Sequence, residues 1–559
     1  MSEFIQRILN HAERAPDALA VEAVSARRGS ERRTRAEVMI AARRAAANLH
    51  AMGVGAGQHV VLIGTHHIDF YGAWLGAVWL GAVPCVLAEP SVRMDRTEYE
   101  LRLTTLLGRI GAKALLCDPR LSFAKNDALP PRVDYAALVS EAGAVEVPPV
   151  TCDEQTPLLL QHSSGTTGIP KGVQLSHGAV LSHFEAYAAR MSLSEADTVA
   201  TWLPLYHDMG LVACFVTPLL VGAPVIWLSP FEWVTNPGSL LSAISKHRAS
   251  VVWLPNFAFY FLAERVRADA NFDLSSLRAV VDCSEPVSAD ALRVFRERFS
   301  SAGLAPAALH TCYAMAENVF VVSTSSASDP PRELQIDAAT WRNRHQAVAA
   351  TAPQECLTLL SSGALVPGCE VRILDEAGAR LPPCTAGRIM LASPFLFDGY
   401  FGRPAREDGV FDTDGFYETG DLGFIDEAGH LYVTGRLKDL IIVGGKNIYP
   451  QELERAAERV EGVYAGRVVA FGIDLAGRGT EGIVILAESE GDPNTWDEIA
   501  SNIRRTVARQ HDADVSDARV VPRGTLRKST SGKLARARNR DDFLSGAFDQ
   551  PSQAKSREE

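Results

Sequence analysis

Apolar runs along the first 330 residues alternate with amphipathic stretches, a pattern that predicts strands and helices in turn. Residues 59–64 form a short apolar run bounded by turn residues, whereas residues 35–52 have helical periodicity. Further strand-like runs lie at residues 112–117, 225–228, 251–254 and 279–282. Strands that alternate with helices form parallel sheets covered on both faces. The pattern therefore predicts an α/β fold with doubly wound sheets in subdomains of about residues 1–150 and 151–330.

The pattern changes after residue 330. Residues 323–332 are polar, and residues 336–350 are typical of a helix and its linker. Shorter strands separated by Gly, Pro and Asp turns follow, which predicts an antiparallel, partly β-barrel-like subdomain at residues 331–436. This completes a large N-terminal domain of residues 1–436. Residues 437–543 predict a small, mobile α+β C-terminal domain, and the polar residues 544–559 predict a disordered tail.

Two long apolar runs, residues 70–88 and 211–228, approach the length of about 20 residues that a membrane-spanning helix needs. Proline and glycine interrupt both, so we expect a buried helix followed by a buried strand in each and no membrane span. The net charge of −12 argues against a nucleic-acid-binding surface. Nine cysteines without CxxC spacing are typical of reduced core residues in a cytoplasmic protein.

A stretch of small and hydroxylated residues separates two predicted strands, at residues 157–160 and 173–175. Nine of the ten residues from Ser163 to Gly172 are Ser, Thr, Gly, Pro or Lys. Glycines let backbone N–H groups approach an anion closely. The spacing lacks the Gly-x-x-x-x-Gly-Lys-Ser/Thr pattern of the Walker loop. The stretch predicts a phosphate-binding loop between two strands, with a flexible turn as the alternative.

This loop resembles the phosphate-binding loop of the adenylate-forming superfamily, which includes acyl-CoA synthetases, fatty acyl-AMP ligases, peptide-synthetase adenylation domains and luciferases. In that family the loop holds the triphosphate of ATP while a carboxylate attacks the α-phosphorus. His162 departs from the nearest branch, which has Tyr or Phe there. The resemblance implies that ATP is bound by Ser163, Ser164, Gly165, Thr166, Thr167, Gly168 and Lys171.

Further segments resemble the nucleotide-binding motifs of this family. Two of them are Tyr417-Glu-Thr-Gly-Asp421 and, further along, Gly435-Arg436. The resemblance implies that Asp421 binds the ribose hydroxyls and that Arg436 binds ribose and phosphate. A carboxylate offers two acceptors to a vicinal diol, and a guanidinium offers a planar fork of donors.

Two turns complete the implied nucleotide site. By resemblance, the backbone of Ser284, Glu285 and Pro286 borders adenine. The segment His310–Asn318 resembles Tyr-Gly-x-x-Glu, which implies that Tyr313 stacks on adenine and that Glu317 has a catalytic role as a ligand of Mg²⁺. Ala314 replaces the usual glycine of this motif, and Asn318 replaces a small or hydroxyl residue, which leaves the identity of the acid open.

Two aromatic segments imply an apolar pocket for the acid. Leu203-Pro-Leu-Tyr-His207-Asp-Met-Gly closely resembles the fatty acyl-AMP ligase pattern, in which the histidine lies near the reacting carboxylate. The resemblance implies a catalytic role for His207. Pro255-Asn-Phe-Ala-Phe resembles another wall of that pocket, and plain core packing is the alternative for both segments. The acyl-pocket residues implied are His207, Asn256, Phe257, Tyr260, Ala314 and Met315.

The C-terminal part contributes a hinge and a lysine. Lys438 falls where the superfamily has its hinge between large and small domains. Residues 524–534 resemble Pro-Lys-Thr-x-Ser-Gly-Lys, which implies that Lys533 is the mobile catalytic lysine that reaches the α-phosphate and the carboxylate. The small domain would then rotate about Lys438 after the first step to admit an acceptor thiol.

Together the motifs imply an enzyme that activates an apolar carboxylic acid, such as a fatty acid, with ATP and Mg²⁺ to acyl-AMP and pyrophosphate. The segment between Glu317 and Gly363 resembles the insertion region of fatty acyl-AMP ligases, which transfer the acyl group to the phosphopantetheine thiol of an acyl carrier protein in biosynthetic pathways. An acyl-CoA ligase is the alternative within the class. A non-catalytic binding protein is a distant alternative, because Asp421, Arg436 and Lys533 are all present.

Overall fold

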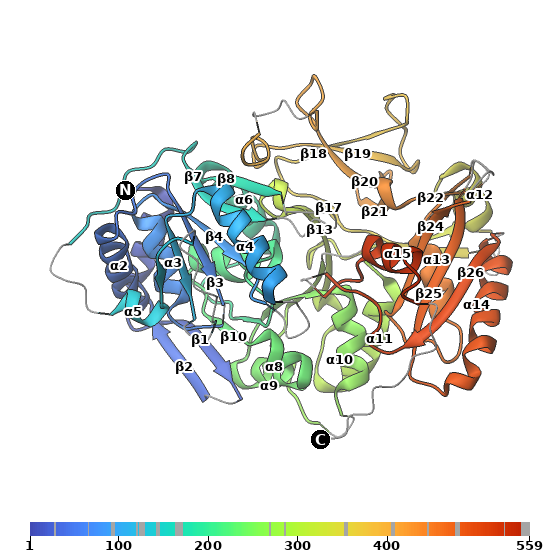
Figure 1. Ribbon diagram of the computed structural model, residues 1–559, viewed down its shortest axis with the longest axis horizontal. Coiled ribbons are helices and arrows are strands. Elements are labelled where there is room, and N and C mark those ends of the chain that lie inside the picture. The colour runs from blue at the N-terminus through green and yellow to red at the C-terminus, as the bar shows by residue number, and fades with distance from the viewer. Residues whose placement is uncertain are drawn as a thin grey trace.

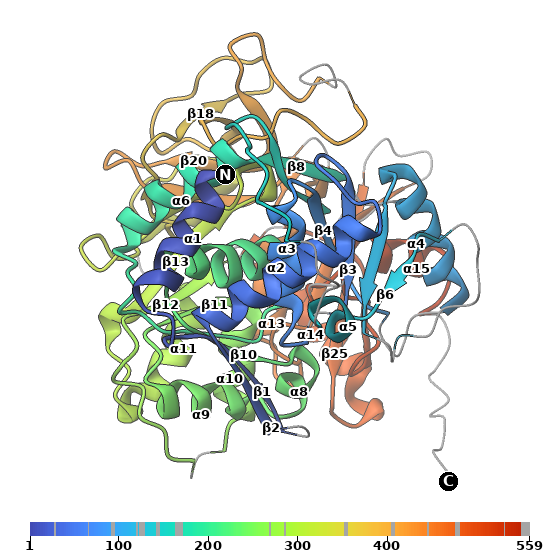
Figure 2. The ribbon, with the colours of Figure 1, turned by 90° about the vertical axis from the view of Figure 1, so that its left-hand side faces the viewer.

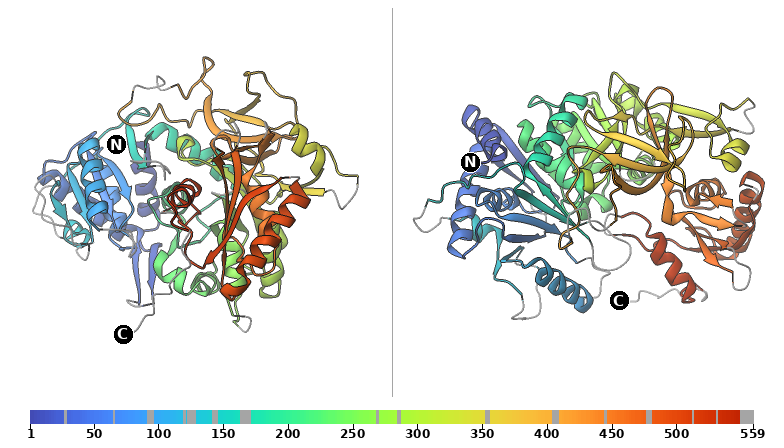
Figure 3. Two further views of the ribbon diagram at one scale, coloured as in Figure 1. Left: turned by 45° about the vertical axis from the view of Figure 1, so that its right-hand side comes forward. Right: turned by 90° about the horizontal axis from the view of Figure 1, so that it is seen from above.

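The computed structural model describes residues 1–26, 29–64, 66–90, 96–118, 121, 129–140, 146–162, 171–267, 270–283, 287–351, 356–403, 409–443, 446–475, 481–511, 513–529 and 532–548. The chain has an α/β fold built on two large mixed sheets (Figure 1). The N-terminal part and the C-terminal part lie at opposite ends of the molecule (Figure 3, right).

The larger sheet has nine strands and is parallel through its centre. Antiparallel pairs flank that centre, β1 with β2 on one side and β13, β14 and β17 on the other. The strand order is β17 (Ala364–Leu365), β14 (Val321–Thr324), β13 (Leu309–Ala314), β12 (Ala279–Cys283), β11 (Val251–Pro255), β9 (Val199–Thr201), β10 (Val225–Leu228), β1 (Leu19–Ser25) and β2 (Gly29–Thr34).

The second sheet has six strands and is parallel except for its last pair. Side chains of β3 alternate between two hydrophobic clusters, with Val60 and Leu62 on one face and Val61 and Ile63 on the other. This alternation explains the uninterrupted apolar run, because a parallel strand is buried on both faces. The order is β6 (Arg132–Val133), β5 (Ala114–Cys117), β3 (His59–Ile63), β4 (Val83–Leu87), β7 (Pro157–His162) and β8 (Gly172–Ser176).

Helices α2 and α3 lie between the two sheets (Figure 2). Every residue of α3 is buried, and Gly72 and Gly76 let its backbone approach α2, since a Cβ at either position would lie 2.5 Å from an alanine Cβ of α2. Among the helices that the structure describes, none is both long and apolar enough to cross a membrane. The helices up to residue 300 are α1 (Glu3–Arg14), α2 (Arg35–Ala51), α3 (Phe70–Trp79), α4 (Arg96–Ile110), α5 (Tyr135–Val139), α6 (His177–Met191), a π-helix (Met209–Val216), α7 (Thr217–Val221), α8 (Pro230–Thr235), α9 (Gly238–His247), α10 (Asn256–Arg265) and α11 (Ala289–Phe299).

A four-stranded antiparallel sheet follows the nine-stranded sheet and lies at the top of Figure 1. Its order is β18 (Glu370–Leu374), β19 (Gly387–Ala392), β20 (Tyr417–Ile425) and β21 (Leu431–Arg436). An insert precedes it, in which β15 (Glu333–Asp337) pairs with β16 (Cys356–Leu360) and α12 (Ala338–Arg344) lies between the two strands along the chain. We refer to residues 333–360 as the insert.

Residues from 437 onward, here called the C-terminal module, have a hydrophobic core of their own, built from residues such as Leu453, Ile485 and Ile503. The module is α+β, as expected. Its elements are β22 (Ile441–Val443), β23 (Lys446–Ile448), α13 (Pro450–Glu458), β24 (Val468–Asp474), β25 (Glu481–Ser489), α14 (Trp496–His511), β26 (Val515–Pro522) and α15 (Arg536–Leu544).

The sheets do not follow the subdomain boundary near residue 150 that the sequence suggests. Strand β1 pairs with β10 in the nine-stranded sheet, whereas β7 and β8 join the six-stranded sheet beside β4. The helix expected from residue 336 begins at Ala338, because Ile336 and Asp337 pair with β16. The antiparallel sheet expected before residue 436 is present as four strands in open order. The division into a large domain of residues 1–436 and a small domain of residues 437–543 stays a proposal. Most of the predicted tail, residues 544–559, lies outside the described residues.

We refer to residues 1–436 as the body. The insert, which is part of the body, contacts the C-terminal module. Trp341 of α12 is 1% exposed, and its indole Nε1 donates to Glu452 Oε1 over 2.7 Å. Its ring also stacks with Tyr449 at 6.1 Å between centroids. A second contact does not involve the insert. The guanidinium of Arg265, at the end of α10, donates to the hydroxyl of Tyr464 in the module over 3.1 Å. These contacts hold α13 against the insert and the body.

Gly363 offers a test of how closely the chain before β17 approaches the end of its neighbour β14 in the nine-stranded sheet. Its φ is +85°, and an added Cβ would overlap the backbone of Thr324 and Ser325. We expect Gly363→Ala to lower the free energy of unfolding by about 1–2 kcal/mol for the left-handed conformation and by a further 1–3 kcal/mol, roughly, for overpacking. Gly378→Ala is the matched control, since its φ is +87° with nothing within 4 Å. Equal midpoints of thermal unfolding in the two variants would contradict this account.

Candidate active site

A cavity of about 570 Å³ lies between the body and the C-terminal module. Its walls come from the start of α10, the end of β13, the ends of β20 and β21, and the loop before α15. It brings together most of the residues that the sequence singles out and that the structure describes, although they are up to 277 positions apart, from Asn256 to Lys533. Of the predicted nucleotide, acyl, hinge and lysine positions, the lining includes Asn256, Phe257, Tyr260, Tyr313, Ala314, Asp421, Arg436, Lys438 and Lys533.

The Asp421 carboxylate lines this cavity and is held from both sides. The Tyr313 hydroxyl donates to Asp421 Oδ2 over 2.5 Å, and Arg436 Nε lies 3.0 Å from Oδ1. Asp421 and Arg436 are direct partners in the β20–β21 ladder, so strand register alone places the pair. The neighbouring carboxylate raises the pKa of the Arg436 guanidinium. Arg436 is therefore a permanent cation, and its exposed side chain has donors left for a ligand.

Tyr313 differs in detail from the expectation. Its hydroxyl is directed at Asp421, and burial raises the pKa of this phenol well above its ordinary value, so it stays a donor. Stacking of its ring on adenine remains a prediction. Asp421 can still accept hydrogen bonds from a ligand, because an ionised carboxylate has about four lone-pair sites.

Glu317 lies one turn beyond β13, in a 3₁₀ turn of residues 316–318. The Tyr400 hydroxyl donates to Glu317 Oε1 over 2.9 Å and lies 3.1 Å from the Tyr417 hydroxyl. Burial is the main cause that raises the pKa of the Glu317 carboxyl. The Lys171 ammonium lies 4.3 Å from the centre of the Tyr400 ring. Tyr400 therefore connects the predicted metal ligand with the lysine of the predicted phosphate loop.

The phosphate loop itself, Ser163 to Gly168, lies outside the described residues, as does the turn of Ser284, Glu285 and Pro286. The base of the loop is described. His162 pairs with Gly172 where β7 meets β8, and the Gly172 carbonyl accepts from Phe401 N over 2.8 Å. The end of β7 and the start of β8 thus lie beside the segment that carries Tyr400.

His162 is buried at the end of β7, 3.3 Å from the Cys85 sulfur through its Nδ1. Burial lowers the pKa of His162 to about 4, with Arg109 adding to the effect. The ring is therefore neutral at pH 7. It does not supply a positive charge to a phosphate.

Lys533 reaches the cavity from the C-terminal module. Gly532, the residue before it, lies against Phe257 of α10, since a Cβ there would be 3.6 Å from the ring. Burial raises the pKa of the Asp208 carboxyl, and the charge of Lys533 offsets part of that shift. Asp208 in turn raises the pKa of Glu317. Lys533, Asp208 and Glu317 are therefore close enough to interact electrostatically.

Two of the six predicted acyl-pocket residues do not line the cavity. Met315 packs between two hydrophobic clusters of the body, and the ring of His207 lies 4.6 Å from that of Tyr206. Asn318 is fully buried and donates to the Val321 carbonyl over 2.9 Å, so it holds the turn after Glu317. The other four, Asn256, Phe257, Tyr260 and Ala314, line it.

A stacked pair of tryptophans supports the aromatic wall. Trp202 and Trp233 lie 3.7 Å apart between centroids and are nearly parallel, and Trp233 contacts Phe261 of the cavity wall at 5.4 Å. Within the part of the chain that the structure describes, the buried Asn256 Oδ1 has no hydrogen-bond partner. A carbonyl oxygen without a partner in a pocket suits a ligand that donates a hydrogen bond.

Sequence reasoning missed Asp208, Tyr400 and Tyr417. Asp208 stands inside the quoted His207 motif, and its type alone could have marked it. Tyr400 carries no local signal, because only the fold brings it to Glu317. Tyr417 opens the motif that ends at Asp421, but its contact with Tyr400 depends on the fold.

Comparison with known proteins adds to this geometry. The family model described as AMP-binding enzyme matches residues 8–401. The chain belongs to the AMP-binding enzyme family. This agrees with the resemblance that the motifs indicate.

Relatives of this AMP-binding enzyme span nearly its whole length. A putative ligase of Mycobacterium tuberculosis is 32% identical and covers 90% of this chain and 94% of its own. The medium-chain-fatty-acid–[acyl-carrier-protein] ligase JamA of Moorena producens is 29% identical, over 88% and 87% of the two chains. A structure from a study of fatty acyl-adenylate ligases from E. coli and L. pneumophila has a TM-score of 0.87 at 26% identity and covers 98% of both chains.

Asp421→Asn tests the nucleotide site of this enzyme. The variant keeps the size of the side chain but removes the charge, so hydrogen bonds to a ribose weaken and Arg436 loses its partner. We expect the Kd for AMP, measured by calorimetry, to rise about 10- to 100-fold, the loss of one hydrogen bond to a charged group. Glu418→Gln on the same strand is the control, because Glu418 pairs with Arg388 outside the cavity. An unchanged Kd for Asp421→Asn would show that the ribose lies elsewhere.

Proposed function

We propose that this enzyme activates an apolar carboxylic acid with ATP, releasing pyrophosphate and forming acyl-AMP, and then transfers the acyl group to the phosphopantetheine thiol of a carrier protein. The observation that carries the proposal is the convergence of Asp421, Arg436, Lys533 and an aromatic wall on one cavity. The names of the relatives, fatty-acid ligases among them, support the substrate class.

In this proposal the nucleotide lies along the side of the cavity formed by β13, β20 and β21. Asp421 accepts hydrogen bonds from the ribose hydroxyls, and Arg436 donates to ribose and α-phosphate. Tyr313 borders adenine together with Ser284, Glu285 and Pro286. The triphosphate lies against Ser163–Gly168, and Lys171 adds a positive charge from the end of that loop.

The residues around Glu317 fit a Mg²⁺ ion. A magnesium ion bound to phosphates takes one or two carboxylates and keeps several waters. Glu317 is such a carboxylate, with one oxygen already oriented by Tyr400, and the part of the chain that the structure describes has no cluster of three or more His, Cys, Asp or Glu that could bind a metal without phosphates. Bound there, the ion would neutralise phosphate charge.

The reaction needs no protein nucleophile. The protein aligns the carboxylate of the acid with the α-phosphorus of ATP. A carboxylate oxygen attacks the α-phosphorus, a new P–O bond forms, and the bond to the β-phosphate oxygen breaks. Negative charge grows on the α-phosphate and on the leaving pyrophosphate. Lys533 and Arg436 stabilise that charge in a partly buried site, where electrostatic interactions are stronger than in water. The protein also removes the entropy cost of bringing two anions together.

The acid lies against α10 in this account. Phe257, Tyr260 and Phe261 provide an apolar wall, and the Trp202–Trp233 stack fixes that wall from behind. The wall suits an alkyl or aromatic acid. His207 and Met315 lie outside the cavity lining, and a role for them in acid binding would need a change of their position.

Lys533→Ala tests the activation step. We expect exchange of labelled pyrophosphate into ATP to depend on an added acid, in a panel from short to long chains with cyclic acids included. The variant should lose this exchange by about 10²-fold or more, while its Kd for ATP changes little. Lys528→Ala in the same loop is a comparison variant with an expected loss of a few-fold. A panel in which no acid supports exchange by the wild-type enzyme would refute the enzymatic proposal.

The acceptor is tested by offering CoA and a phosphopantetheinylated carrier protein in parallel. We expect acyl transfer to the carrier to exceed transfer to CoA at equal concentration, measured by mass spectrometry of both products. Faster acyl-CoA formation would favour the alternative, an acyl-CoA ligase. One relative is named a putative acyl-CoA synthetase.

A further inference from the structure

The turn that follows Glu317 has a strained backbone. Val319 has φ +63° and ψ −57°, and Phe320 N donates to the Asn318 carbonyl over 2.6 Å. These values define a γ-turn of the rare, strained type. A positive φ is an outlier for a β-branched residue, and Val319 is also fully buried. Strain of this kind persists only where the surrounding structure imposes it, and it gathers at functional sites.

Helix α6 supports the chain that leaves this turn. Val321 N, two residues after Val319, donates to His183 Nε2 over 2.9 Å. His183 is fully buried, and burial lowers its pKa to about 3. The ring is therefore neutral, and one of its nitrogens can accept a hydrogen bond. Because a buried backbone N–H needs a partner, His183 fixes the path of the chain after the turn.

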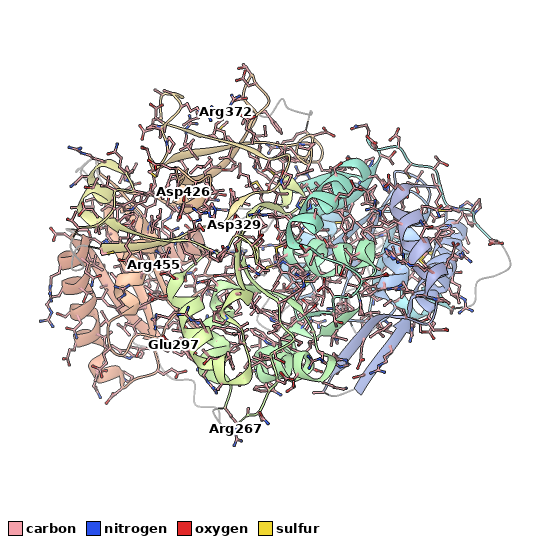
Figure 4. All side chains as sticks on the ribbon, turned by 180° about the vertical axis from the view of Figure 1, so that it is seen from behind. Arg267, Glu297, Asp329, Arg372, Asp426 and Arg455 are labelled. Carbon is pink, nitrogen blue, oxygen red and sulfur yellow. The ribbon has the colours of Figure 1, made fainter. Side chains whose placement is uncertain are left out.

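The same helix also contacts the far end of strand β14. Arg190 lies seven residues after His183, which is two turns along the same face of α6. Its guanidinium donates to the Thr324 carbonyl over 3.2 Å and to Asp329 over 2.6 Å. Asp329 is labelled near the centre of the rear view in Figure 4. Two helical turns and a four-residue strand both span about 10 Å, so α6 supports β14 at its two ends.

The chain after β19 makes a second set of contacts with the turn. Ser393 Oγ donates to Asn318 Oδ1, and Phe397 N donates to the Glu317 carbonyl over 2.9 Å. Three residues after Phe397, the Tyr400 hydroxyl donates to Glu317 Oε1. This segment therefore holds both the backbone and the carboxylate of Glu317.

Asn318 connects the two sets of contacts. Its Oδ1 accepts from Ser393, and its Nδ2 donates to the Val321 carbonyl over 2.9 Å. Val321 is also the residue whose N–H donates to His183. Asn318 is fully buried, so solvent does not replace either contact. An alanine at this position would make neither contact, which gives the departure of Asn318 from the family motif a structural reason.

We propose that His183 and Asn318 are positioning residues for Glu317: they hold the strained turn at Val319, and the turn holds the Glu317 carboxylate where it binds Mg²⁺ beside the phosphates of ATP. This inference rests on the proposed function. Neither positioning residue lines the active-site cavity. Their contacts lie wholly within the body, so they do not depend on the position of the C-terminal module.

The first test removes the acceptor on α6. His183→Phe keeps an aromatic ring but leaves Val321 N without its partner. Mn²⁺ takes the same oxygen ligands as Mg²⁺ and serves as the probe. We expect the Kd of Mn²⁺ in the complex of full-length enzyme with ATP, measured by electron paramagnetic resonance, to rise about tenfold, the lower end of the effect of groups that orient a metal ligand. The Kd for ATP in EDTA should stay within twofold.

His183→Gln is the rescue variant, because its amide oxygen can accept from Val321 N, and it should keep the Kd of Mn²⁺ within threefold of the wild-type value. Asn318→Ala is an independent variant that should also raise this Kd about tenfold. Tyr187→Phe is the matched control. Tyr187 is fully buried one turn after His183 on α6, and its hydroxyl accepts from Trp253 Nε1 over 2.8 Å. Its loss should lower the midpoint of thermal unfolding but leave the Kd of Mn²⁺ within twofold.

Combination with Glu317→Gln separates positioning from general loosening of the fold. If His183 acts through Glu317, adding His183→Phe to Glu317→Gln changes the Kd of Mn²⁺ by less than twofold. Losses that multiply overturn the proposal. So does a normal Kd in His183→Phe, Asn318→Ala or Glu317→Gln, or a rise that Tyr187→Phe shares. Acid-dependent pyrophosphate exchange by the wild-type enzyme tests the proposed function separately: its absence refutes that function, whereas normal exchange with an unchanged Kd in the variants refutes only the positioning of Glu317.

Discussion

The position of the Asp421 carboxylate is the constraint on which the candidate site depends. Tyr313 and Arg436 hold it from two sides, and the three residues come from β13, β20 and β21. β13 belongs to the nine-stranded sheet, and the other two belong to the four-stranded sheet, so this small network joins the two sheets. A carboxylate that is buried and paired in this way is costly to displace, because its partner would be left without its counter-charge.

The same network leads directly to the C-terminal module. Arg436 is the last residue of β21, and the turn of residues 437–439 follows it. Asp439 accepts from Arg536 over 2.6 Å, and Arg536 also donates to Glu454 over 2.8 Å. The turn is thus tied to α13 and α15 of the module while Asp421 ties its other end to the body. If the module rotates as proposed, the pivot lies between these two anchored groups, where Leu437 and Lys438 are the intervening residues.

Strands with continuous apolar runs were predictable from the sequence, because burial on both faces leaves a local signature, as in residues 59–63 and 251–255. Which sheet each strand joins was not predictable, because β1 pairs with β10 through residues that lie about 200 positions apart in the sequence. The family motifs placed Asp421, Arg436 and Lys533, whose roles remain proposals. Tyr400 had no sequence signal, because it becomes a neighbour of Glu317 and Tyr417 only in the fold.

The central claim is that a carboxylate oxygen attacks the α-phosphorus and leaves with AMP. It is tested most directly with an acid labelled with ¹⁸O at both carboxylate oxygens, followed by transfer to the thiol acceptor and mass spectrometry of the released nucleotide. The account predicts AMP that carries one ¹⁸O atom, because the bridging oxygen of the acyl-AMP comes from the acid. AMP without the label, or label in inorganic phosphate instead, would contradict it.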